Sequence, residues 1–175
     1  MKIAEFDASA LFAAMDAQRV YRGLSWPQVA KEIWELSAVL ARSRHQDHPI
    51  SPSTITNMAK RKNISCQHAL FFLRWLGGLA PETFLGTGRS EGVPLPDVGP
   101  DRRLRWDLRA TYEALDARRR EEKMTWAQLA VVLRCQPNQL TNLKRARFAT
   151  GMRLAMRVTQ WLGRPAADFV YAAAW

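Results

Sequence analysis

The fold is decided by one stretch in the second half of the chain, Thr125-Trp-Ala-Gln-Leu-Ala-Val-Val-Leu-Arg-Cys-Gln-Pro-Asn-Gln-Leu-Thr-Asn-Leu-Lys-Arg145. Thr125 and Gln128 form the capping-box pattern that starts a helix. Pro137 is tolerated at the first position of a second helix, and apolar residues recur at helical spacing before and after the break. These apolar residues are Leu129, Leu133, Leu140 and Leu143. The stretch therefore predicts two short helices joined by a sharp turn.

The first half of the chain repeats this pattern. Residues 6–34 align with residues 106–134 at an offset of 100, residues 52–57 with 137–142 at an offset of 85, and residues 75–77 with 161–163 at an offset of 86. The identities at the first offset are Asp7, Ala10, Ala14, Asp16, Ala17, Arg19, Trp26, Gln28 and Ala30. A repeat of this size indicates two copies of one small domain, so one copy is the unit to interpret.

Each copy predicts five short helices and no strand, so the expected fold class is all-α. In the first copy the helices are expected over about 8–22, from 25, from 51, over 66–76 and from 81. In the second copy they are expected over about 108–122, from 125, from 136, over 151–162 and from 165. Asp7 and Asp107 are natural N-caps, and Gly77 and Gly163 are predicted to end helices in the left-handed conformation.

The copies and the residues between them predict three segments. We expect a first domain over residues 1–85, a linker rich in proline and glycine over 86–105, and a second domain over 106–175. The first domain carries an insertion at about residues 35–49, where the second copy has only a tight turn. The apolar spacing predicts that its second helix continues to about Arg42 before a polar loop.

Composition narrows the class of partner. The formal net charge of +10 and an isoelectric point near 10.4 favour polyanionic partners. Cys66 and Cys135 lie at non-equivalent positions, so no disulfide is expected and a reducing cytoplasm fits best. No apolar run has the length of a signal peptide or a membrane span, so we expect no membrane partner.

Catalytic and metal-binding patterns are weak. No serine, histidine and aspartate arrangement and no cysteine and histidine pair recurs in both copies, so we expect neither an enzyme nor a cofactor. His68 lies on an apolar helix and is interpreted as a packing residue. A polar stretch brings together His45, Asp47 and His48, but such loops produce this clustering without a metal.

The stretch over residues 125–145 resembles the lambda-repressor/Cro-like helix-turn-helix family, also called the XRE family. The first copy resembles it through residues 23–30, 50–57 and 74–77. The resemblance implies two tandem five-helix domains whose third helix enters the DNA major groove. Arg134 stands in the turn where the family often has glycine, at a modest cost if its φ is positive. Trp26 and Trp126 replace a glutamine that contacts phosphate in relatives, and we interpret them as packing residues.

By position, the resemblance places two sets of side chains toward double-stranded DNA. The expected base-contacting residues are Asn138, Gln139, Asn142 and Arg145 in the second copy and Ser53, Thr54, Asn57 and Lys60 in the first. The expected phosphate-contacting residues are Gln128, Gln136, Lys144, Arg147, Gln28, Ser51, Arg61 and Lys62. Asparagine and glutamine can pair with adenine and arginine with guanine, whereas phosphate contacts set orientation without selecting sequence.

The function implied is sequence-specific DNA binding by a bacterial transcriptional regulator. The alternative is a protein-interaction module on the same fold, such as an antiactivator, antitoxin or scaffold, with Trp26, Trp34 and the insertion as contacts. Self-association of the chain also stays open.

Overall fold

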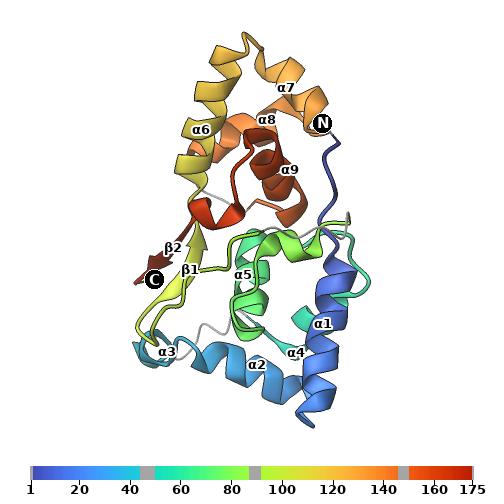
Figure 1. Cartoon of the computed structure of the whole chain (residues 1–175). Helices are drawn as coiled ribbons and strands as arrows, with labels where there is room; N and C mark the ends of the chain where they lie inside the picture. The colour runs from blue at the N-terminus through green and yellow to red at the C-terminus, as the bar shows by residue number, and fades with distance from the viewer. Residues whose placement is uncertain (1, 44–49, 87–91, 146–149, 175) are drawn as a thin grey trace.

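The computed structural model describes residues 2–43, 50–86, 92–145 and 150–174 (Figure 1). The first half contains helices α1 (Ala8–Tyr21), α2 (Trp26–Glu35), α3 (Ala38–Ser43), α4 (Pro52–Met58) and α5 (Cys66–Trp75) and the 3₁₀ helix η1 (Pro81–Phe84). The second half contains strand β1 (Arg103–Trp106), helices α6 (Leu108–Glu121), α7 (Trp126–Val132) and α8 (Pro137–Thr141), the 3₁₀ helix η2 (Asn142–Arg145), helix α9 (Met152–Leu162), the 3₁₀ helix η3 (Ala166–Phe169) and strand β2 (Val170–Ala173). The described chain is mostly helical, as expected.

The two halves share their local structure. Residues 11–30 and 111–130 show the same succession of helix and turn and the same order of buried and exposed positions. Asp7 accepts a hydrogen bond from the amide of Ala10, and Asp107 accepts one from the amide of Ala110. The capping box predicted at Thr125 is formed, and Ser25 forms its equivalent in the first half. Local sequence therefore fixes the first two helices of each half in the same way.

The predicted glycine positions are confirmed. Gly77 has a φ of 93° and Gly163 a φ of 65°, so both take the left-handed conformation after the last long helix of their half. Glycine adopts this conformation without the steric cost that a Cβ brings.

A small antiparallel sheet was not expected. Strand β1, formed partly by residues assigned to the linker, pairs with β2 from Arg103 opposite Ala173 to Trp106 opposite Val170. At the equivalent place, the described residues of the first half form an isolated bridge between Phe6 and Leu85. Four-residue strands carry too short an alternating pattern to be recognised in the sequence, and their pairing depends on contacts distant in the chain.

The prediction that the second helix continues to Arg42 is wrong. Helix α2 ends at Glu35, and α3 begins at Ala38. Arg74 donates a hydrogen bond of 2.8 Å to the carbonyl of Leu36, and the amide of Val39 donates to the carbonyl of Pro100. These partners replace helical hydrogen bonds at the break, so tertiary contacts end the helix.

Residues 92–99, between the halves, have no helix or strand and lie against the first half. Leu95 is buried, and its amide donates to the carbonyl of Gly78. Arg74 donates to the carbonyls of Val98, Gly99 and Arg102. Burial lowers the pKa of Arg74, while the charge of Asp97 opposes that shift. These contacts dock the segment on the first half.

The larger hydrophobic core contains residues of both halves. Phe72 and Ile55 from the first half share it with Met156 and Phe169 from the second. The smaller core belongs to the second half and contains Leu115, Leu129, Ala130, Leu133, Leu140, Leu143, Leu154, Val158 and Trp161. Figure 1 shows α5 and α9 near the centre, between the outer helices of the two halves. The halves are therefore packed together through apolar side chains.

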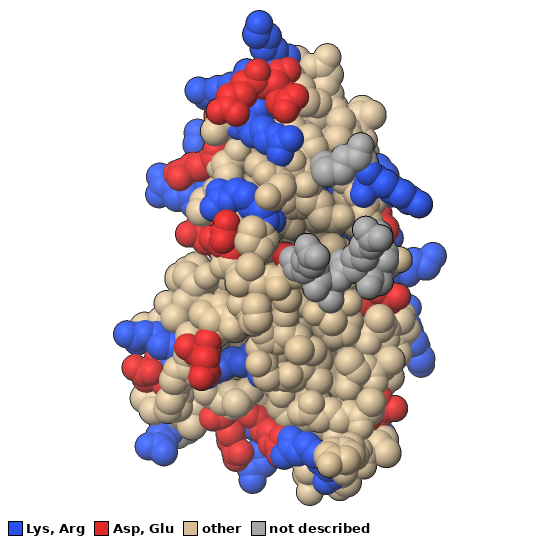
Figure 2. All heavy atoms as spheres, in the orientation of Figure 1, with Lys and Arg blue, Asp and Glu red and all other residues tan. Residues whose placement is uncertain are grey.

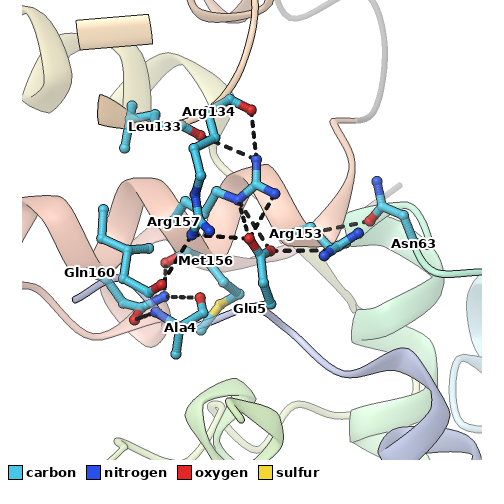
Figure 3. Close-up of polar contacts among 10 residues, drawn as sticks. Ala4, Glu5, Asn63, Leu133, Arg134, Arg153, Met156, Arg157 and Gln160 are labelled. Atoms are coloured by element: carbon cyan, nitrogen blue, oxygen red, sulfur yellow. Dashed lines mark hydrogen bonds and ion pairs between the residues drawn. The ribbon is translucent and has the colours of Figure 1, made fainter. Parts of the chain in front are cut away.

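An arginine cluster ties the N-terminal segment to the second half (Figure 3). Glu5 lies 3.0 Å from Arg134, 3.1 Å from Arg153 and 2.9 Å from Arg157. Burial on its own raises the pKa of Glu5, but the hydrogen bond from Arg157 and the three positive charges lower it overall. Gln160 adds a pair of hydrogen bonds with the backbone of Ala4.

Replacing Glu5 with glutamine should therefore destabilise the protein by about 1–2 kcal/mol near neutral pH, because a charged hydrogen-bonding partner of three arginines is lost. A carboxylate whose pKa is lowered in the folded state stabilises it above the unfolded pKa, and this contribution is lost as the pH falls. The difference should shrink as the pH falls below the unfolded pKa of Glu5. Urea unfolding at several pH values measures it.

Glu35→Gln is the matched control, since Glu35 pairs with Lys31 at 3.7 Å with both side chains mostly exposed. Exposed pairs of this kind contribute little. An equal loss of stability for the two variants would contradict a structural role for Glu5.

No helix among the described residues is both long and apolar enough to cross a lipid bilayer.

Candidate nucleic-acid interface

The segment formed by α8 and η2 exposes its amide side chains. Asn138, Gln139 and Asn142 are exposed, whereas Leu140 is fully buried and Leu143 is 4% exposed. The two leucines lie in the smaller core, against α6 and α7. The segment is thus held by its apolar side and presents polar groups on the other.

The turn before α8 has the expected backbone conformation. Arg134 has a φ of 53°, in the left-handed region that costs a non-glycine residue about 1 kcal/mol. Its side chain contacts Glu5 and donates to the carbonyl of Ile3 at 3.0 Å. Arginine at this position is less favourable than glycine for the backbone conformation, but its side chain contacts the N-terminal segment, which glycine could not do.

Three glutamines predicted to contact DNA use their side-chain oxygens to cap helices. The side-chain oxygen of Gln139 accepts from the amide of Gln136 at 2.8 Å, that of Gln128 from Thr125 at 2.8 Å, and that of Gln28 from Ser25 at 2.7 Å. Their NH₂ groups still have donors for phosphate oxygen. Gln139 cannot pair with adenine through both its oxygen and its nitrogen without giving up its cap.

In the first half, α4 presents a different set of groups. The hydroxyl of Ser51 lies 2.8 Å from that of Ser53 and 2.9 Å from that of Thr54, and it also caps the helix. Ser53 and Asn57 are exposed, and Thr54 is half-buried. With Arg61 these side chains line a hollow of about 430 Å³. The polar side of α4 therefore faces a concave surface, and its hydroxyl groups bond to one another.

Basic side chains follow both of these helices. Lys60, Arg61 and Lys62 are exposed after α4, and Lys144 and Arg145 are exposed on η2. Lys144 also lies 6.0 Å from the ring centre of Tyr112. Arg147, a predicted phosphate contact, lies outside the described residues. Figure 2 shows Lys and Arg next to Asp and Glu over the opposite tips of one face, so that face is not uniformly basic.

Trp26 and Trp126 are packing residues, as predicted. Trp26 stacks on Phe12 at 5.3 Å and lies 4.8 Å from the guanidinium of Arg19. The second half repeats this arrangement with Tyr112, Trp126 and Arg119 at 5.4 Å and 4.6 Å. Each tryptophan is therefore enclosed by an aromatic ring and a cation at the start of its helix.

The arginine of each packing group also binds a carboxylate. Arg119 contacts Asp116 at 2.6 Å and donates to the carbonyl of Met124 at 2.7 Å. The hydrogen bond from Arg119 lowers the pKa of Asp116. The sequence signal for this group was the recurrence of aspartate and arginine three residues apart in both copies. The repeat alone does not show that this pair encloses a tryptophan.

Arg119→Ala should destabilise the protein by about 2–3 kcal/mol, because Asp116 and the Met124 carbonyl lose a mostly buried partner. Arg120→Ala is the matched control, since Arg120 also pairs with Asp116, at 2.8 Å, but is 72% exposed. The control should change stability by no more than about 0.5 kcal/mol. Thermal unfolding of both variants measures the difference, and equal losses would refute the packing role.

Metal binding and disulfide formation both depend on how side chains are arranged in space. They contain no group of three or more His, Cys, Asp or Glu side chains arranged to hold a metal ion. The earlier candidates His45, Asp47 and His48 lie outside them. Both cysteines are free thiols, and burial raises the pKa of Cys66 and of Cys135.

The functional geometry thus consists of an exposed amide-bearing segment, a second polar helix beside a hollow, and basic residues after each. Glu5, Arg153 and Arg157, which hold the halves together, were missed because their contacts occur once and leave no repeated pattern. Comparison with protein-family models, with curated proteins and with solved structures finds no match to this chain.

Proposed function

We propose that this chain binds double-stranded DNA sequence-specifically as a transcriptional regulator, through two helix-turn-helix units of the XRE type. The units are α2 with α4 in the first half and α7 with α8 in the second. The observation that carries the proposal is the exposure of Asn138 and Asn142 on a helix whose leucines are buried. A helix held in this way can enter the major groove with its polar side.

Each group has a distinct task in this proposal. Asn138 and Asn142 pair with base edges, for which asparagine suits adenine, and Arg145 suits guanine. Arg61, Lys62, Lys144 and Arg147 neutralise phosphates. Lys60, expected above to contact a base, is assigned to phosphate with them because it lies beyond the end of α4 at Met58. Gln28 and Gln128 donate to phosphate through their side-chain NH₂ groups. Their side-chain oxygens stay bonded to the capping residues at the starts of α2 and α7. The formal net charge of +10 supports a polyanionic partner.

The test begins with selection of tight-binding duplexes from a random library by the full chain. Asn142→Ala should weaken binding to the selected duplex by about 5- to 150-fold, the range expected for losing one good base contact. Its binding to an unrelated duplex should not change. Fluorescence anisotropy measures both, with Gln18→Ala on α1 as an amide-to-alanine control. Equal weakening on both duplexes would contradict base contact by Asn142.

A protein-interaction module on the same fold is the second candidate. It is favoured by exposed apolar side chains, since Tyr21 is 92% exposed and Val131 is 77% exposed. Gel filtration of the chain with a cell lysate discriminates the two. A stoichiometric protein partner with no retained DNA would favour this candidate over DNA binding.

A further inference from the structure

The two halves meet through a reciprocal backbone contact. Ser65 caps α5, Gly151 precedes α9, and these two residues form an antiparallel bridge. The amide of Cys66 donates to the carbonyl of Thr150 at 2.9 Å, and the amide of Met152 donates to the carbonyl of Ile64 at 2.7 Å. At the offset of 86, Ile64 corresponds to Thr150 and Cys66 to Met152. Each hydrogen bond is therefore the copy of the other with the halves exchanged.

The segments that lead into the two halves cross over in the same reciprocal way. Residues before α1 lie on α9, where Gln160 donates to the carbonyl of Ala4 at 2.9 Å. Residues before α6 lie on α5, where Gln67 donates to the carbonyl of Leu104 at 2.9 Å. Ala4 and Leu104 are equivalent at the offset of 100, but the donors are not, because Gln67 corresponds to Arg153 at the offset of 86. Arg153 binds Glu5, the neighbour of Ala4, so the reciprocal relation holds for the segments and the helices rather than for each hydrogen bond. Contacts in which equivalent surfaces exchange roles are those of a two-fold axis.

We propose that the halves are related by an approximate two-fold axis through the bridge of Ser65 and Gly151, and that one chain binds an inverted repeat as a monomer. This inference rests on the proposed DNA-binding function. Ser65 lies seven residues after the end of α4, and Gly151 lies six residues after the end of η2. In this proposal the two candidate recognition segments therefore flank the axis. A two-fold axis relates the two recognition helices by a half-turn. The two DNA half-sites that they contact must therefore be in inverted orientation.

The half-sites are not identical, because the equivalent positions carry different groups. At the offset of 85, Asn57 corresponds to Asn142, Ser53 to Asn138 and Lys60 to Arg145. The shared asparagine gives both half-sites the same preferred base at one mirrored position. The hydroxyl of Ser53 is bonded to Ser51, so the half-site under α4 is specified less strongly than the half-site under α8.

The test uses the full chain and a library of random duplexes about 30 bp long, enough for half-sites separated by one helical turn of about 34 Å. The expected product is one motif with two inverted, unequal halves that share a mirrored base. Asn142→Ala should relax that base in the stronger half only, and Asn57→Ala in the weaker half only. Native mass spectrometry should find one chain on each selected duplex.

Three results would overturn the inference while leaving DNA binding in place. These are two halves in the same orientation, a single half-site that Asn57→Ala leaves unchanged, and two chains on a symmetric palindrome. A library with no enriched sequence would overturn the proposed function and this inference together.

Discussion

Replacing Lys60, Arg61 and Lys62 together with glutamine should weaken duplex binding by about 10²- to 10³-fold at a salt concentration of about 0.1 M. Each lost phosphate contact lowers the slope of log affinity against log salt by about 0.9, so three contacts lower it by about 2.7. The affinities should converge as the salt approaches about 1 M, where counterion release contributes little. Fluorescence anisotropy over a salt series measures both affinity and slope.

The matched control removes the same number of charges elsewhere. Arg102 precedes β1, Arg109 lies in the first turn of α6, and Arg164 precedes η3, so all three are close in sequence to the small sheet and not to α4 or α8. Each pairs with a carboxylate, Asp101, Glu113 or Asp168. Their triple replacement with glutamine should leave the salt slope within about one contact of the original. Equal losses for both triple variants would show that only net charge matters.

Features written in both copies could be predicted from the sequence. The caps at Asp7 and Asp107, the two capping boxes and the left-handed glycines depend on residues a few positions apart. Such local patterns do not depend on contacts between distant segments. Each pattern occurs in both copies, and chance rarely produces a pattern that recurs at equivalent positions.

Features that join the halves could not be predicted. The carboxylate of Glu5 finds its arginines more than a hundred residues away, and Arg74 ends α2 by binding the carbonyl of Leu36. The pairing of β1 with β2 likewise joins distant segments. The periodicity of one segment does not show which distant group forms hydrogen bonds with its backbone. These contacts can therefore be identified only in the folded structure.

The candidate site divides in the same way. The pattern of buried leucines predicts which side of α8 is exposed, and Asn138 and Asn142 lie on that side. The hydrogen bonds made by their neighbours were not predictable, since Gln139 caps its own helix and Ser53 bonds to Ser51. A polar residue at a helix start can serve the backbone or a ligand, and sequence alone does not distinguish the two.

Leu140→Ala should destabilise the protein by about 2–5 kcal/mol, because the leucine is fully buried and its removal leaves a cavity. Leu140 belongs to the smaller core, whose members come from the second half. The loss should therefore concentrate in α7 and α8, and binding of the selected duplex should weaken with it. Urea unfolding measures the stability, and hydrogen exchange locates the amides that lose protection.

The equivalent variant in the first half separates a general effect from a local one. Ile55 is also fully buried, but it lies in the larger core that both halves share. Ile55→Ala should cost a similar free energy of unfolding and expose amides of α1, α2 and α4, with α7 and α8 still protected. Val131→Ala, at an exposed position of α7, should change stability by no more than about 0.5 kcal/mol. Loss of protection in the same helices for Leu140→Ala and Ile55→Ala would mean that the two cores unfold as one unit and that α8 is not supported by its own core.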